Sequence, residues 1–164
     1  MRYYLDCEFS DTGRVIDLIS IALVAEDGRE LYLVSTEFDE SLAPPWVREH
    51  VLPQLEPRDD GMWRTRAEIR DEILALVGED PRPAFWANAG AYDFVALVQL
   101  IGPLVEVPPG WPYFVRDLRQ WADRLGVERL PEQQTEKHHA LLDARFTRDL
   151  YGFLAAVEER AAGG

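Results

Sequence analysis

The sequence has little cysteine, little lysine and no long hydrophobic run. Cys7 is the sole cysteine, so no disulfide can form within the chain, and we expect a reducing compartment such as the cytoplasm. There is no run of about 18 apolar residues and no apolar N-terminal core, so we expect neither a membrane-spanning helix nor an export signal. Basic residues number 17 against 30 acidic ones, a net charge of −13 that argues against a passive coat for nucleic acids.

The chain does contain enough apolar material for a core. Its 164 residues are 47% hydrophobic and include five tryptophans, which is typical of a globular protein. We find no internal repeat, no low-complexity linker and no break in composition. Residues 1–164 are therefore expected to form one domain.

Local patterns predict a mixed sheet with helices packed on its faces. Three apolar segments at 2–9, 15–26 and 30–36 predict an antiparallel opening, with Asp27-Gly28 as the turn between the last two. Capping signals and helical spacing predict the helices that follow. Two further strands, 83–88 and 114–115, complete a five-stranded sheet, and the predicted helices are a short one near 44–53, then 65–77, 91–101, 117–125 and 138–159. The predicted fold class is α/β.

Two carboxylates stand one residue apart in the first predicted strand. Side chains i and i+2 of a strand share a face, so Asp6 and Glu8 project together, while Leu5, Cys7 and Phe9 point to the other side. Two like charges in an apolar strand destabilise it unless something binds them. A divalent cation would do so, because it prefers hard oxygen ligands. The alternative is a solvated strand edge, which is common in acidic proteins.

Asp93 comes just after the predicted strand 83–88, in the first turn of the predicted helix 91–101. Strand ends that lead into helix starts are frequent positions for sites in open sheets. A carboxylate in a first helical turn also interacts favourably with the helix dipole. The position of Asp93 alone therefore does not require a catalytic role.

Asp143 and two histidines occupy the start of the last predicted helix. His139 precedes Asp143 by four residues and His138 by five, so His138 can lie near Asp143 without stacking directly on it. A helix N-terminus disfavours an imidazolium and so favours a neutral histidine, which is what a general base requires. Two surface histidines are the alternative.

Taken in order, these segments resemble the motifs of the DEDDh 3′–5′ exonucleases, whose fold is ribonuclease H-like. The matching segments are Asp6-Cys7-Glu8, Asn88 to Tyr92-Asp93, and His138 to Asp143. The resemblance covers nearly the whole chain and is greatest to the RNase T-like exoribonucleases of actinobacteria that act on polyadenylated RNA. Cys7 and Phe9-Ser10 depart from the threonine and Thr-Gly of many members. His139 stands where the sister DEDDy group has tyrosine, but the five-residue offset assigns His138 as the base.

The resemblance implies a site for two Mg²⁺ or Mn²⁺ ions. Four carboxylates converging on one cleft would hold the ions roughly 3.5–4 Å apart, and these are Asp6, Glu8, Asp93 and Asp143. One ion would acidify the attacking water and the second would stabilise the leaving 3′-oxygen, while His138 would take the proton of the water. The expected partner is single-stranded RNA with a free 3′ end, and the expected product is a nucleoside 5′-monophosphate.

Aromatic, amide and arginine side chains are the candidates for substrate contacts. Phe9, Trp63 and Tyr92 could stack on a terminal base, which is worth roughly 1–3 kcal/mol per base. Asn88 belongs to the same motif as Tyr92, whereas Trp86 is expected in the core. The candidates for phosphate contacts are Arg64, Arg66, Arg70, Arg116 and Arg119, most of which are expected on solvated helix faces.

Other functions of the same fold remain open from the sequence. A DNA 3′–5′ exonuclease or an oligoribonuclease would need the same carboxylates. A catalytically silent module that binds a nucleotide or a protein would not, because it has no use for repelling charges. Family members are often homodimers, so a homodimer is a further expectation from the resemblance, and no membrane partner is expected.

Overall fold

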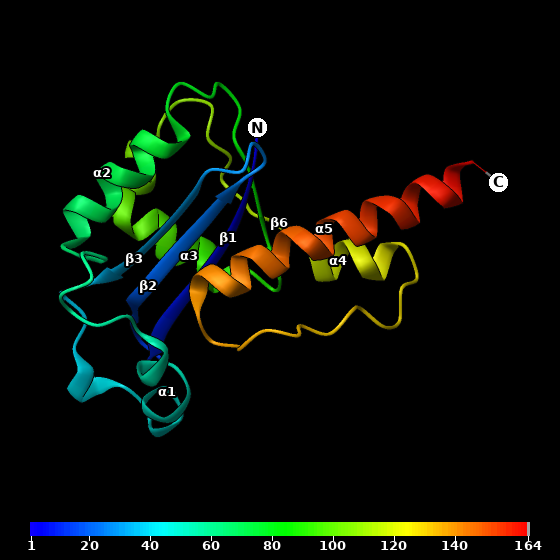
Figure 1. Cartoon of the computed structure of the whole chain (residues 1–164). Coiled ribbons are helices and arrows are strands. Elements are labelled where there is room, and N and C mark those ends of the chain that lie inside the picture. Colours follow the sequence, from blue (N-terminus) through cyan, green and yellow to red (C-terminus); the bar gives the residue numbers. More distant parts are fainter. Residues whose placement is uncertain (164) are drawn as a thin grey trace.

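The computed structural model describes residues 1–163 (Figure 1). Its strands are β1 (Arg2–Asp11), β2 (Ile16–Ala25), β3 (Glu30–Ser35), β4 (Trp63–Arg64), β5 (Ala84–Ala87) and β6 (Arg116–Asp117). Its helices are α1 (Pro45–His50), α2 (Arg66–Val77), α3 (Ala91–Ile101), α4 (Leu118–Arg124) and α5 (Ala140–Ala162). Short 3₁₀ turns lie at Glu40–Leu42, Leu52–Gln54 and Leu104–Glu106. None of the helices within residues 1–163 has the length and apolar character needed to cross a bilayer.

The strands form one mixed sheet in the order β4-β3-β2-β1-β5-β6. The first three strands are antiparallel to one another, as predicted, while β4, β5 and β6 each join by parallel pairing. The α/β class is confirmed, and the arrangement is compatible with a ribonuclease H-like fold. The predicted count of five strands was one short, because β4 is only two residues long and is defined by its pairing with β3.

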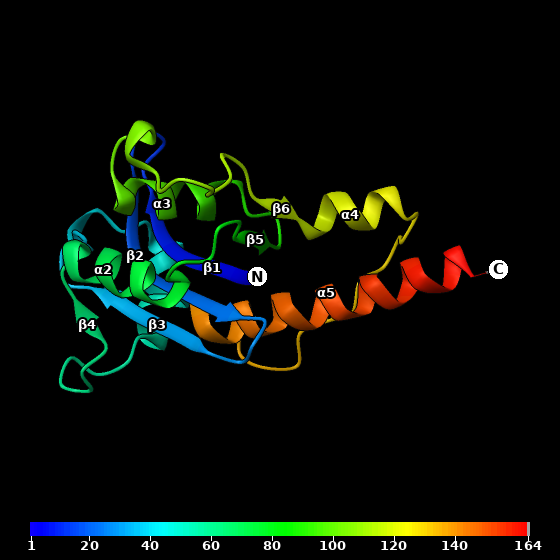
Figure 2. The same ribbon diagram turned by 90° about the horizontal axis from the view of Figure 1, so that it is seen from above.

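Helices cover both faces of the sheet (Figure 2). α2 and α3 lie on one face, and α5 crosses the other with α4 beside it (Figures 1 and 2). Side chains alternate between these layers as strand geometry requires. Leu5 packs in the core under α2 and α3, whereas its neighbour Tyr4 packs with Ala144 of α5.

Several boundaries follow from local signals that the sequence displays. Thr65 caps α2 in a complete capping box with Glu68, and Gly78 ends the helix. Asp117 caps α4 by accepting from the backbone N–H groups of Arg119 and Gln120.

Two predicted boundaries were wrong. The sixth strand lies at Arg116–Asp117 rather than at 114–115, because only these residues pair with β5. The last helix begins at Ala140 rather than at His138. His138 has a φ of 67°, which a right-handed helix does not accept, so it lies before the helix as part of the preceding segment.

Candidate active site

The first part of the site comes from β1. Leu5 and Cys7 belong to the core under α2 and α3, so by strand alternation Asp6 and Glu8 lie on the other face with Tyr4, which packs against α5. Glu8 is only 9% exposed. Phe9 also packs against the opposite core, although the pairing of β1 with β2 shifts register between Glu8 and Phe9. Burial raises the pKa of the Cys7 thiol well above its ordinary value, so Cys7 is an inert core residue.

The short strand β5 brings Asp93 to β1. β5 pairs with β1 only as far as Tyr4, which leaves the Cys7 backbone N–H without a strand partner on that side. The carboxylate of Asp93 accepts this N–H at 2.8 Å, so the first turn of α3 takes the place that a longer β5 would occupy. The turn between them is tight, because a Cβ at Gly90 would lie 2.1 Å from the Cβ of Ala87. Glycine at position 90 therefore lets α3 start directly at the end of β5.

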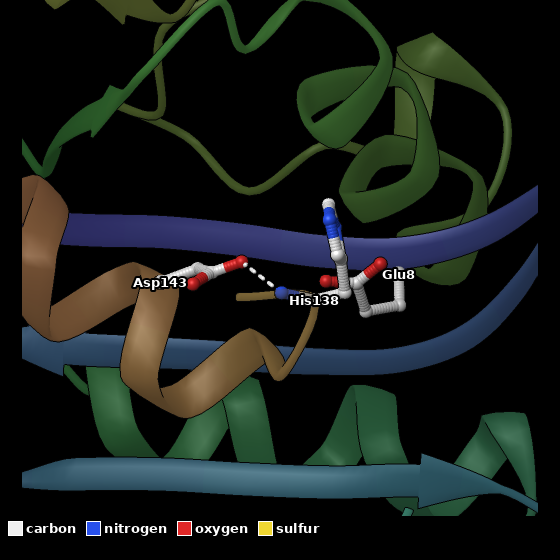
Figure 3. A group of neighbouring side chains, drawn as sticks. All are labelled: Glu8, His138 and Asp143. Atoms are coloured by element: carbon white, nitrogen blue, oxygen red, sulfur yellow. Dashed lines mark hydrogen bonds between the residues drawn. The ribbon is translucent and has the colours of Figure 1, made fainter. Parts of the chain in front are cut away.

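The start of α5 brings Asp143 and His138 to the same place (Figure 3). The backbone N–H of His138 donates to Oδ2 of Asp143 at 2.9 Å, and the side-chain amide of Gln133 donates to Oδ1. The imidazole of His138 points away from the Asp143 carboxylate to which its backbone is bound. One ligand atom each from Glu8, His138 and Asp143 nevertheless lie within 4.8 Å of one another.

The electrostatics show that these carboxylates crowd one another. Burial raises the pKa of Asp6 well above its ordinary value, with further contributions from Asp93, Glu8 and Asp143. Burial and the same kind of repulsion raise the pKa of Glu8 to about 8. Burial also raises the pKa of Asp93 to about 6, although the hydrogen bond from the Cys7 backbone opposes it. The charges of Asp93 and Asp143 therefore disfavour ionisation of both Asp6 and Glu8.

This donor set fits a hard divalent cation. Carboxylate oxygens are the preferred ligands of Mg²⁺ and Mn²⁺, and a cation would relieve the repulsion that raises these pKa values. The cluster of Glu8, His138 and Asp143 has the spacing of a possible metal site. The chemistry of the residues is thus compatible with a metal centre.

The candidate substrate residues Phe9 and Tyr92 lie next to each other. Their ring centroids are 5.8 Å apart, and the side chain of Tyr92 is 51% exposed. Tyr92 and Asp93 are consecutive residues of α3, so the aromatic pair adjoins the carboxylates.

Asn88 lines a cavity of about 400 Å³ that also contains His138 and Asp143. Its side-chain oxygen accepts from Nε of Arg119 at 2.7 Å, which places one of the candidate arginines in the same cavity. Two further basic residues, Arg129 and Lys137, line it as well. Glu128 and Glu132 also line the cavity, so its basic side chains stand among acidic ones.

Other candidates lie apart from this cluster. Trp63 belongs to β4, the outermost strand, three strand spacings or ~14 Å from β1. Its indole N–H donates to the backbone oxygen of Glu56, and Arg58 covers its ring. Trp86 packs between sheet and helices, as expected. The arginines around α2 are ion-paired, Arg64 with Glu72, Arg66 with Asp17 and Arg70 with Asp71, and Arg116 lies over the rings of Trp86 and Phe114.

The structure adds three residues that sequence reasoning did not place at the site. Gln133 holds one oxygen of Asp143, and Asp117, besides capping α4, accepts the Gly90 N–H at 2.9 Å. The ring of Trp46 meets that of His138 edge to face at 4.7 Å. Trp46 is 92 positions from His138, so no local pattern could have linked the two.

Comparison with known proteins identifies the class of the molecule. Two curated proteins of Mycobacterium tuberculosis, from strains CDC 1551 / Oshkosh and H37Rv, are each 47% identical to the chain. Each match covers 99% of this chain and 98% of the relative, and both relatives are named 3′–5′ exoribonuclease. The chain belongs to this bacterial exoribonuclease family. A scan against models of known protein families finds no match.

Proposed function

We propose that this chain is a metal-dependent 3′–5′ exoribonuclease of the DEDDh type, which releases nucleoside 5′-monophosphates from the free 3′ end of single-stranded RNA. One observation carries the proposal: ligand atoms of Glu8, His138 and Asp143 lie within 4.8 Å of one another, and the charges of Asp93, Glu8 and Asp143 all raise the pKa of Asp6. The names of the relatives support the same activity. A preference for polyadenylated RNA is part of the proposal and rests on the resemblance of the motifs.

The four carboxylates have the role of metal ligands in this proposal. Asp6, Glu8, Asp93 and Asp143 would hold two divalent cations, which when bound supply charge neutralisation and activation of water at the scissile phosphate. Gln133 and the His138 backbone engage both oxygens of Asp143, and the Cys7 backbone engages Asp93. Two of the four carboxylates are therefore held in place by the protein before any substrate arrives.

His138 has the role of general base. Its imidazole reaches the carboxylate cluster from a segment outside the helix, where it can accept the proton of the attacking water. General-base catalysis of this kind contributes roughly 10²- to 10⁴-fold to the rate.

The substrate would occupy the surfaces on either side of the carboxylates. Phe9 and Tyr92 offer an aromatic pair for the terminal base, and Asn88, Arg119 and Lys137 line the adjoining cavity where phosphates of the strand can bind. In a chain of net charge −13, Arg119, Arg129 and Lys137 would supply the positive charge that binds the strand at this cavity. Trp63 remains a candidate only for bases farther along the strand.

The proposal also covers organisation. We propose that residues 1–164 act as one exonuclease domain, in a reducing cytoplasm that suits the free Cys7. A homodimer is proposed by analogy with the family. The exposed apolar side chains Leu104, Val105 and Phe114 would be buried in its interface. Sedimentation equilibrium tests this, and a monomer at all concentrations would contradict it.

The activity is tested with 5′-labelled poly(A) RNA and single-stranded DNA of the matching sequence, both incubated with Mg²⁺. We expect the RNA to shorten one nucleotide at a time, with AMP as the product, and RNA blocked by a 3′-phosphate to resist. His138→Ala should lower the rate by about 10²- to 10⁴-fold, because the general base is lost.

Three outcomes would contradict parts of the proposal. Degradation of DNA alone would overturn the assignment to RNA. Shortening of the blocked RNA at the same rate would overturn the requirement for a free 3′ end. If neither nucleic acid is degraded, the chain is a silent binding module rather than an enzyme.

A further inference from the structure

The helix α1 is fixed to the sheet by one side and carries two aromatic rings on another. Val47, Val51 and Ala43 are buried against Ile19 of β2, which anchors the helix. Trp46 and His50 are four residues apart and therefore neighbours on the helix surface. Trp46 is 50% exposed, so the core does not require its ring.

These two rings are stacked on each other. Their centroids are 4.8 Å apart with an interplanar angle of 13°. The ring nitrogen Nδ1 of His50 lies 3.0 Å from the backbone oxygen of Trp46, and because a carbonyl only accepts, Nδ1 carries the proton of this bond. The orientation of His50 is thereby fixed, and Trp46 is held against it.

The imidazole of His138 stands upright against this stack. Its ring makes an edge-to-face contact with Trp46, with centroids 4.7 Å apart and an interplanar angle of 82°, and it lies 6.3 Å from the ring of His50 at 84°. Perpendicular arrangements at these distances are the favoured ones for aromatic pairs.

Little else orients the His138 side chain. Its backbone has a left-handed φ of 67° and lies in a segment without regular secondary structure, between α4 and α5. The hydrogen bond to Asp143 comes from the backbone N–H, and within residues 1–163 no hydrogen bond involves the imidazole. The ring would thus be free to rotate about its side-chain torsions without a packing partner.

We propose that Trp46, braced by His50, is a positioning residue that holds the His138 imidazole in the orientation needed for proton transfer. The inference rests on the proposed function, in which His138 is the general base. In this role Trp46 acts through His138, whose ring it contacts. A base that is misplaced by about 1 Å can lose about 10²-fold in rate, so a packing contact of this kind matters for kcat.

The test is a double-mutant cycle on the full chain with poly(A) RNA. Trp46→Ala should lower kcat by about 10- to 100-fold with KM within about twofold of wild type, because the base is still present but no longer held. Trp46→Phe should restore most of kcat, since an aromatic face remains, whereas Trp46→Leu should not. In the His138→Ala background, Trp46→Ala should cause no further loss. Leu42→Ala, an exposed apolar change next to α1, is the control and should leave kcat unchanged.

Aromatic NMR spectra give a readout that does not depend on activity. The His138 ring signals, identified by their loss in His138→Ala, should be displaced by the ring current of Trp46 and should move in Trp46→Ala. If they move but the wild type degrades no RNA, the proposed function fails and the positioning role fails with it.

If the wild type is active and Trp46→Ala retains full kcat, the positioning role is wrong and the proposed function stands. A rise in KM alone, equal in both backgrounds, would place Trp46 against the substrate instead and overturn the inference.

Discussion

At the scale of single residues, Glu8 combines burial with repulsion from neighbouring carboxylates. Its side chain is almost fully buried, and Asp143 and Asp93 are the charges that face it. The backbone around it is an ordinary strand, so the cost of this arrangement lies in the charges and not in strain. A bound cation would relieve this repulsion. The same burial that disfavours a free carboxylate also strengthens its attraction to the ion.

The metal-free protein should therefore lose stability as the pH rises. Glu8 has a pKa of about 8 in the folded state against an ordinary value of 4.5, so its contribution is fully present below about pH 4.5 and is lost as the pH rises through 8. The difference amounts to at most about 5 kcal/mol. Urea unfolding in EDTA at pH 5 and pH 9 measures it, and Glu8→Gln should flatten the dependence. An unchanged slope in the variant would show that Glu8 is not responsible.

Residue spacing in the sequence predicted which carboxylates belong to the site, but it did not predict the residues that contact the site groups. The pair Asp6 and Glu8 follows from strand alternation, and the offset of five residues distinguished His138 from His139. The partners of these groups come from distant positions, such as Gln133 for Asp143 and Trp46 for His138. A contact between distant positions leaves no periodic signal in one sequence, so only the folded chain reveals it.

At the scale of elements, the accuracy of the sequence predictions depended on where the defining interaction lies. α2 could be predicted because the residues that begin and end it, Thr65 with Glu68 and Gly78, lie within or next to the segment itself. β4 was missed and β6 was displaced because each consists of two residues that count as a strand only through a neighbour. α5 began later than predicted because His138 has a left-handed φ, with its backbone N–H donating to the Asp143 carboxylate.

The cap of α2 makes a prediction that is separate from the active site. Oγ1 of Thr65 accepts from the backbone N–H of Glu68 at 3.3 Å, and the Glu68 carboxylate accepts from the Thr65 N–H at 2.8 Å. Thr65→Ala should lower the free energy of unfolding by about 1 kcal/mol, as measured by urea titration, while Thr65→Ser should be nearly neutral. The rate of RNA degradation should be unaffected in both, because α2 lies on the face of the sheet away from α5. A loss of activity in Thr65→Ala with normal stability would contradict this separation.

At the scale of the whole molecule, the site draws its carboxylates from three layers of the fold that also pack on one another. The carboxylates come from β1, α3 and α5, which lie in three different layers. A bound cation would therefore link the two helical layers through the sheet. Stability of the whole chain should depend on the metal for this reason, in addition to the relief of local repulsion.

Addition of Mn²⁺ should raise the melting temperature of the wild type. At a concentration 100 times the dissociation constant, binding adds about 2.7 kcal/mol, which corresponds to a rise of about 5–10 °C for a chain of this size. Asp6→Ala should largely abolish the rise, because Asp6 is the carboxylate that all the others face. Differential scanning calorimetry of both proteins with and without Mn²⁺ is the measurement. An equal rise in both would place the metal elsewhere.

The early end of β5 has a consequence for the way such a site can arise. β1 runs to Asp11, but its pairing with β5 stops at Tyr4. The backbone N–H of Cys7 therefore donates to the carboxylate of Asp93 in α3 instead of to a strand. A backbone N–H that could otherwise pair with another strand here donates to the carboxylate of Asp93. A β5 long enough to bond the Cys7 amide would take the hydrogen bond that Asp93 now accepts, so the short ladder between β1 and β5 is what leaves room for this carboxylate.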